Sequence, residues 1–297
     1  MSQREPGSPR PRGEPAAPPP QGKQRQAWPA REASLRPRAD HGEESYRGAG
    51  KLEGRVALVT GGDGGVGRAI AIAYAREGAD VALSYLDGHD DAAETLRWVE
   101  KAGRRGVALP GDITDRAHCR ALVDETVRRL GRLDILVNNA SVHFDTAFED
   151  LDPLQFERVV RTNLFAPVWL TQASLAYLPE GGVVLNTGSV AGLLGHATLS
   201  DYAATKAALH NLTRSLSQAL ASRGIRVNCV APGPVWTPHA PPTRAQEPEE
   251  GFGRDTLWHR PAQPAEIAPS YVFLASQDGR FYTGELLAPT GMSVTTR

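Results

Sequence analysis

Residues 55–79 read RVALVTGGDGGVGRAIAIAYAREGA, and this stretch decides the fold. Its first six residues form an apolar run, typical of a strand buried on both faces of a parallel sheet. Gly61, Gly65 and Gly67 then allow a tight turn and a close approach of the backbone to a ligand. Apolar residues recur with helical period after the turn. We therefore predict a strand, a glycine-rich turn and a helix whose N-terminal N–H groups could bind a pyrophosphate.

Strand and helix patterns alternate from residue 51 onward, which predicts an α/β fold with a Rossmann-type, doubly wound parallel sheet. The expected strands, about seven, are 55–60, 80–85, 105–109, 133–137, 181–187, 225–230 and 285–289. The expected helices are 66–78, 89–103, 115–130, 153–178, 201–223 and 264–276. Pro289 cannot donate to a sheet, so we place the last strand at an edge or shorten it.

Composition favours a cytoplasmic enzyme with one domain and a tail. The chain has 297 residues, 40% of them hydrophobic, and a net charge of −1 that exerts no general attraction on nucleic acid or membranes. Its two cysteines, Cys119 and Cys229, cannot form a disulfide framework. There is no run of eighteen apolar residues that could span a membrane. We expect no metal site.

Residues 201–212, DYAATKAALHNL, place a phenol and an ammonium on one helical face. Tyr202 and Lys206 are four residues apart, so their side chains lie one turn above the other. A nearby cation favours the phenolate and should lower the tyrosine pKa from its usual value of about 10. Taken alone, such a pair is ordinary helix surface. The motifs around it support a catalytic interpretation instead.

Seven motifs in this chain follow the order and approximate spacing of one family. They are TGGDGGVG at 60–67, GD at 111–112, NNA at 138–140, Asn163, Ser189, YAATK at 202–206 and PGPVWT at 232–237. Over residues 51–297 the chain resembles the short-chain dehydrogenases/reductases. Within that family it looks most like the glucose and ribitol dehydrogenase subgroup, which carries an N-terminal extension.

The resemblance implies an NAD(P)-dependent oxidoreductase that acts on a carbonyl or alcohol. Tyr202 would exchange the proton on the substrate oxygen, and Ser189, thirteen residues earlier, would hydrogen-bond that oxygen. Lys206 would lower the tyrosine pKa and hold the cofactor ribose, while Asn163 would keep a water in the proton relay. Ser141 departs from the family's usual glycine after NNA, which could shift the backbone near the nicotinamide.

The same resemblance marks a set of cofactor-binding residues. They are Gly61, Asp63, Gly65, Val66, Gly67, Tyr85, Asp112, Ile113, Asn139, Ala140, Tyr202, Lys206, Pro232, Gly233, Val235 and Thr237. Tyr85 occupies the position where NAD-preferring relatives carry an acid that binds the ribose 2′-hydroxyl. No arginine or lysine stands at 84–88 to bind a 2′-phosphate, and Asp87 could partly replace the missing acid. The cofactor is NADP or NAD, and we favour NADP.

The substrate pocket is expected in three segments. These are Val142 to Phe144, the group Leu193, Leu194 and His196, and the loop 236–260, which we interpret as a mobile lid. His143 or His196 could hydrogen-bond a polar substrate. The subgroup suggests sugars, polyols, aldehydes or ketones.

Residues 1–50 form a proline- and arginine-rich extension, expected to be disordered to about residue 27. It contains no apolar segment of the kind found in secretory signals. Trp28 and Tyr46 are bulky anchors, so the part from 28 to 51 should lie against the domain or a neighbouring subunit. A basic arm for nucleic acid is the alternative, weakened by the acids at 40, 43 and 44.

Two alternatives to an enzyme remain. One is a nucleotide-sensing or regulatory protein on the same fold, which would have no need for a tuned tyrosine. The other is a nucleic-acid or partner-binding scaffold that depends on the arginine-rich tail. The family also leads us to expect a homo-oligomer, a dimer or a tetramer, formed through the helices at 153–178 and 201–223.

Overall fold

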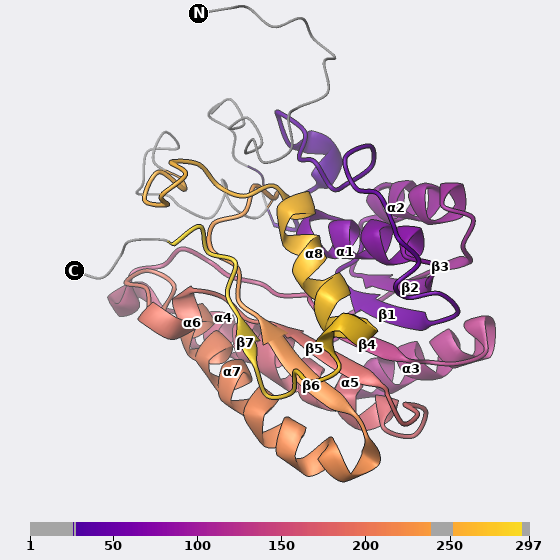
Figure 1. The fold of residues 1–297 in the computed structure, drawn as a ribbon. Coiled ribbons are helices and arrows are strands. Elements are labelled where there is room, and N and C mark those ends of the chain that lie inside the picture. The colour runs from indigo at the N-terminus through magenta and orange to yellow at the C-terminus, as the bar shows by residue number, and fades with distance from the viewer. Residues whose placement is uncertain (1–25, 27, 239–251, 293–297) are drawn as a thin grey trace, which may run out of the picture.

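A seven-stranded, fully parallel sheet forms the centre of the molecule (Figure 1). The computed structural model describes residue 26, residues 28–238 and residues 252–292. The strand order is β3-β2-β1-β4-β5-β6-β7, which is the Rossmann-type, doubly wound arrangement predicted from the sequence. The strands are β1 (Val56–Thr60), β2 (Asp80–Tyr85), β3 (Gly106–Pro110), β4 (Ile135–Asn138), β5 (Val183–Thr187), β6 (Arg226–Val230) and β7 (Leu286–Leu287).

Helices cover both faces of the sheet (Figure 1). They are α1 (Gly65–Arg76), α2 (His89–Lys101), α3 (Arg116–Leu130), α4 (Pro153–Val160), α5 (Ala166–Ser174), α6 (Ala191–Leu194), α7 (Ser200–Leu220) and α8 (Pro264–Ala275). Helices α1 and α8 pack against each other on one face, and α3 packs against α5 on the other. Because both faces are covered, the inner strands are buried on both sides, as their continuous apolar runs predict.

Two hydrophobic cores lie on opposite faces of the sheet, and alternate residues of one strand contribute to each. In β1, Val59 belongs to the core that contains Ile70 of α1. Its neighbour Leu58 belongs to the core that contains Leu122 of α3. Both β1 side chains are completely buried. Successive strand residues point to opposite faces, so each strand is fixed from both sides and its carboxyl end is held rigidly.

Three elements differ from the sequence prediction. The single helix expected at 153–178 is instead two helices, α4 and α5. A π-helical turn at Arg161–Phe165, which contains Asn163, joins them. The four-residue helix α6 was not predicted, and α7 ends at Leu220 with a 3-10 turn at Ala221–Arg223. Strand β7 is two residues long and lies at the sheet edge, in agreement with the limit that Pro289 imposes.

The chain from 28 to 47 lies against the domain rather than away from it. Leu35 and Ala39 are buried in a small cluster with Trp236, and the Trp236 indole Nε1 donates to the Pro37 carbonyl at 3.0 Å. The Ala265 N–H at the start of α8 donates to the Asp40 carbonyl at 2.9 Å. We expected disorder to about residue 27, and of residues 1–27 only residue 26 is among the described residues. Among the described residues, no helix has the length and apolar character needed to cross a membrane.

Candidate active site

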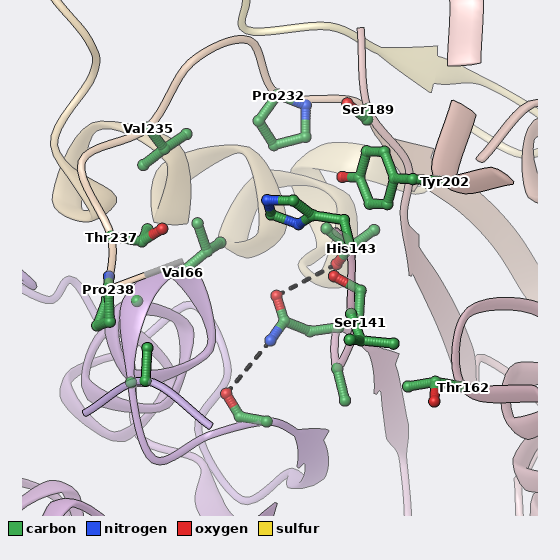
Figure 2. Close-up of a pocket in the computed structure, with 18 of the residues that line it drawn as sticks. Val66, Ser141, His143, Thr162, Ser189, Tyr202, Pro232, Val235, Thr237 and Pro238 are labelled. Atoms are coloured by element: carbon green, nitrogen blue, oxygen red, sulfur yellow. Dashed lines mark hydrogen bonds between the residues drawn. The ribbon is translucent and has the colours of Figure 1, made fainter. Parts of the chain in front are cut away.

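A pocket lies at the carboxyl ends of the strands, where a doubly wound sheet binds its ligands (Figure 2). Most of the predicted cofactor residues line it. These are Gly61, Asp63, Gly65, Val66, Tyr85, Asp112, Ile113, Asn139, Ala140, Tyr202, Pro232, Gly233, Val235 and Thr237, together with Ser141 and Ser189. The other three predicted residues, Gly67, Asn163 and Lys206, are buried beside the pocket and do not line it.

The glycine-rich turn needs its glycines for two physical reasons. Gly61 and Gly65 have φ angles of 63° and 50°, in the left-handed region that disfavours other residues. A Cβ on Gly67 would lie 1.9 Å from the Gly61 carbonyl oxygen. A Cβ on Gly65 would lie 3.1 Å from the Thr237 methyl group, across the pocket. The turn therefore forms a close-fitting cradle that larger side chains would fill.

Asn139 ties three strand ends together beneath this turn. Its side-chain nitrogen donates to the Thr60 carbonyl at 2.9 Å, and its side-chain oxygen accepts from the Thr187 hydroxyl at 3.4 Å. Its backbone N–H donates to the Thr60 hydroxyl at 2.9 Å. These contacts join β1, β4 and β5. They hold the ends of these three strands in place without a ligand, which preorganises the site.

Ser189, Tyr202 and His143 come together at one end of the pocket, away from Val66 and Thr237 (Figure 2). Ser189 follows β5, and Tyr202 lies in the first turn of α7. The His143 and Tyr202 rings pack with their centres 5.1 Å apart. Lys206, one turn further along α7, is 2% exposed, and its Nζ lies 5.3 Å from the centre of the Tyr202 ring. That Nζ donates to the Thr187 carbonyl at 2.7 Å.

The Tyr202 pKa differs from the sequence expectation. Burial raises it above its usual value, and only the hydrogen bond with Ser189 acts to lower it. Burial also lowers the pKa of Lys206 to about 8. The lysine is four residues from the tyrosine, as expected, but the charge of a buried ammonium is itself disfavoured. Among the chain's own groups, the desolvation of both side chains therefore outweighs the attraction predicted from their spacing.

Asn163 explains the π-helical turn between α4 and α5. Its side chain accepts from the Val142 N–H at 2.9 Å and donates to the Val142 carbonyl at 2.8 Å. It also donates to the Thr205 hydroxyl at 3.3 Å. The extra residue in the turn directs this amide inward, a common use of π-bulges at functional sites. The Asn163 side chain thus positions the segment that carries His143, and its role in a proton relay stays a prediction.

The predicted substrate residues divide into two groups. Val142, His143, Leu194 and His196 line the pocket, whereas Leu193 is 50% exposed and lies outside the lining. Phe144 packs edge-on against Trp28, with ring centres 6.4 Å apart. Pro238, Phe252 and Asp255 also line the pocket. The remainder of the expected lid, residues 239–251, lies outside the described residues.

The opposite end of the pocket is more acidic than expected. The Tyr85 hydroxyl lies 2.9 Å from Nδ1 of His89, and its ring is buried at the end of β2. Burial raises the pKa of Asp63 to about 6, and the nearby carboxylates of Asp91 and Glu32 add to the effect. The sequence analysis included neither of these two carboxylates in the site.

Glu32 lies in the N-terminal wall of the pocket, residues 28–32, which the sequence analysis did not place in the site. The Glu32 carboxylate accepts from the Gly65 N–H at 2.7 Å, at the N-terminus of α1, and lies 3.2 Å from Nε2 of His41. Glu32 is 6% exposed. The carboxylate therefore caps a helix from 33 residues away, where the helix dipole favours a negative charge. Trp28 and Tyr46, two bulky residues in a polar segment, were the sequence signals of this docking.

The buried pair between Glu32 and His41 should make the docking of this segment depend on pH. Glu32 and Glu43 raise the pKa of His41 to about 9. Since the folded pKa lies above the usual value of about 6.5, the stabilisation is complete below pH 6.5 and is lost as pH rises through 9. His41→Gln should lower the free energy of unfolding by about 2 kcal/mol at pH 6 and change it little at pH 10. Urea denaturation at both pH values measures this, and an equal loss at both would contradict it.

Comparisons with known proteins agree with this geometry. A family model described as short chain dehydrogenase matches residues 55–248. The glucose and ribitol dehydrogenase of Daucus carota is 42% identical over 93% of this chain and 97% of its own length. The chloroplastic NADPH-dependent aldehyde reductase 1 of Arabidopsis thaliana is 41% identical over 92% and 98%. A Burkholderia cenocepacia short chain dehydrogenase solved with NADP is 34% identical, with a TM-score of 0.77 over 81% of this chain and 98% of its own.

Proposed function

The chain belongs to the short-chain dehydrogenase/reductase family of oxidoreductases, and we propose that it transfers a hydride between NAD(P) and a carbonyl or alcohol substrate. One observation carries this proposal. Ser189, Tyr202 and Lys206 meet at one end of a pocket whose other end holds a glycine-rich turn at a helix N-terminus. A binding protein without chemistry would have no need for a phenol and an ammonium placed together there.

The pocket fits a dinucleotide, since the absent Cβ at Gly65 leaves room between the glycine-rich turn and the Thr237 side chain. Glu32 already accepts from the Gly65 N–H, so we expect the next two N–H groups of α1, those of Val66 and Gly67, to bind the pyrophosphate. Asp112 and Ile113 line the pocket where we expect adenine, and we expect Pro232, Val235 and Thr237, which also line it, to contact the nicotinamide half of the cofactor. The cofactor, when bound, supplies or accepts the hydride.

Side chains of the protein would carry out the proton transfer. Tyr202 gives a proton to the substrate oxygen in the reductive direction and takes it back in oxidation. Ser189 donates a hydrogen bond to the same oxygen and stabilises the charge that develops there. Lys206 brings a positive charge 5.3 Å from the centre of the tyrosine ring, and we expect it to hold the cofactor ribose. Asn163 keeps Val142 and the adjoining His143 in position beside the tyrosine.

We propose NADP rather than NAD, and a sugar, polyol, aldehyde or ketone as substrate. Two relatives support the substrate class, since one is named for glucose and ribitol and the other for aldehydes. One of them is NADPH-dependent, and a solved neighbour holds NADP. His143 and His196 line the substrate end, where they offer polar contacts to hydroxyl groups. No residue at 84–88 offers a cation for the 2′-phosphate.

We also propose that the protein is a cytoplasmic homo-oligomer. Leu154, Phe156 and Phe165, on α4 and the following π turn, are 74%, 44% and 42% exposed. Apolar side chains gathered on neighbouring helical turns support a subunit interface there. The free, buried thiols of Cys119 and Cys229 support a reducing compartment. Light scattering of the purified protein would separate a dimer or tetramer from a monomer.

The proposal is tested by a fluorescence titration with NADPH and NADH, followed by a substrate panel on the same sample. The panel contains sugars, polyols, aldehydes and ketones, and the absorbance of the reduced nicotinamide reports turnover. We expect binding of at least one cofactor and turnover of at least one substrate. Binding without turnover across the panel would favour a nucleotide sensor. Failure to bind either nucleotide would overturn the proposal.

A further inference from the structure

We propose that Arg31, from the N-terminal segment, binds the 2′-phosphate of NADP and so selects this cofactor. The inference rests on the proposed function, because it names the group that gives the cofactor site its preference. Residues 84–88 carry neither arginine nor lysine, yet the structure brings Arg31 to this place from more than fifty residues away. The N-terminal segment becomes part of the cofactor site rather than an appendage.

The Arg31 guanidinium lies directly after β2, where the adenosine ribose meets the sheet in this fold. Its Nη2 is 3.1 Å from the Asp87 carboxylate, and its Nη1 would be 3.1 Å from a Cβ on Gly88. Arg31 lines the same pocket as Tyr85 and Asp63. Its side chain is 38% exposed, so a ligand in the pocket can reach it.

The backbone around Arg31 is fixed in advance. The Arg31 N–H donates to the Gln26 side chain at 2.7 Å, and the Glu32 N–H donates to the Asp91 carboxylate at 2.9 Å. Glu32 itself is anchored to Gly65 at 2.7 Å. Since the chain is held on both sides of Arg31, little freedom of its backbone is lost when its side chain binds a phosphate.

The same wall continues toward the adenine end of the pocket. The Arg158 guanidinium lies 4.4 Å from the centre of the Trp28 ring, and it faces the Asp112 carboxylate at 3.9 Å. Trp28 and Arg158 both line the pocket. The N-terminal segment thus offers an aromatic ring near the predicted adenine contact and a cation near the predicted ribose contact. An aromatic ring and a cation are the groups that would contact an adenine base and a ribose phosphate.

The nearby acids Asp63, Asp87 and Asp91 are the main objection to phosphate binding, and the contacts of the last two answer part of it. Asp91 is occupied by the N–H groups of Glu32 and Ala33 and by Arg68. Asp87 pairs with Arg31 at a partly exposed site, where such a pair contributes little to stability. A phosphate accepts two parallel hydrogen bonds from a guanidinium and carries more charge than one carboxylate, so it can displace Asp87.

The experiment compares Arg31→Gln, Asp87→Asn and wild type by fluorescence titration of the full chain with NADPH and NADH. Arg31→Gln should weaken NADPH binding about 10- to 100-fold, the range of a charge-assisted hydrogen bond, and change NADH binding less than about threefold. Asp87→Asn should tighten NADPH binding several-fold, because it removes the competing carboxylate. Arg36→Ala is the matched control, since this arginine lies in the same segment but does not line the pocket. It should leave both affinities unchanged.

Adenosine 2′-phosphate and adenosine, used as competitors, isolate the contact. Arg31→Gln should weaken the first and leave the second unchanged. Equal loss of NADPH and NADH binding in Arg31→Gln would assign Arg31 to the fold of the segment and overturn the inference. So would an unchanged NADPH affinity, or a loss of NADH binding alone in Asp87→Asn. These results differ from a failure of the proposed function, in which the wild-type protein binds neither nucleotide.

Discussion

Replacing Tyr202 by phenylalanine should lower turnover at least about a hundredfold, the usual scale of a lost acid/base, and leave NADPH binding near the wild-type value. The variant loses one hydroxyl group and keeps the ring that packs 5.1 Å from His143. Binding should persist because the glycine-rich turn and the N-terminal wall, at the other end of the pocket, are untouched. Single-turnover rates and a nucleotide titration on the same preparation measure both quantities.

Tyr177→Phe is the matched control for this substitution. Its hydroxyl donates to Asp124 at 2.8 Å on the surface, so the change removes the same atom far from the pocket. We expect turnover and binding in this variant to equal those of the wild type. If Tyr202→Phe kept its turnover, another group would have to move the proton, and the tyrosine assignment would be wrong.

The pH dependence of turnover should report the same residue. Burial raises the Tyr202 pKa, and only the Ser189 hydrogen bond opposes this within the chain. We therefore expect Ser189→Ala to raise the tyrosine pKa further and to move the basic limb of the rate profile to higher pH. A rate profile in the reductive direction, extended to about pH 11.5 so that it covers a limb above pH 10, checks the direction for both proteins. A shift toward lower pH would show that Ser189 does not donate to the phenolate.

The parallel sheet could be predicted from the sequence because its signals are local. The apolar run before Gly61 and the alternation of strand and helix need no knowledge of distant contacts. The candidate catalytic pair could be proposed for a similar reason, since Tyr202 and Lys206 are four residues apart on one helix face. The lining of the pocket by Gly61, Val66 and Thr237 likewise follows from motifs at the carboxyl ends of the strands.

The sequence predicted that residues 28–51 lie against the domain or a neighbouring subunit, but not that residues 28–32 line the pocket, because that placement depends on polar contacts between distant segments. Glu32 meets Gly65 and Asp91 through single hydrogen bonds, which leave no periodic pattern in the sequence. The direction of the Tyr202 pKa shift could not be predicted from the sequence for a different reason. Spacing gives the distance to Lys206, but the pKa also depends on how much water surrounds both groups.

Replacing Lys206 by methionine should stabilise the protein without nucleotide while it destroys most of the activity. Burial lowers the Lys206 pKa to about 8, so at pH 7 the fold carries a charged ammonium at a cost of about 3 kcal/mol. Methionine removes that cost and forfeits the bond to the Thr187 carbonyl, worth about 1 kcal/mol. We expect the free energy of unfolding to rise by about 2 kcal/mol at pH 7, and turnover and NADPH affinity both to fall.

The pH dependence of the stability gain distinguishes the removal of a buried charge from a general change in packing. A lysine whose folded pKa is depressed lowers stability below pH 8, and the penalty fades as pH rises toward 10.5. The gain from Lys206→Met should therefore shrink between pH 7 and pH 10, as measured by urea denaturation. Lys101→Met, on the exposed surface of α2, should show neither effect. If Lys206→Met reduced turnover but bound NADPH normally, the lysine would serve the tyrosine alone and the ribose contact would be wrong.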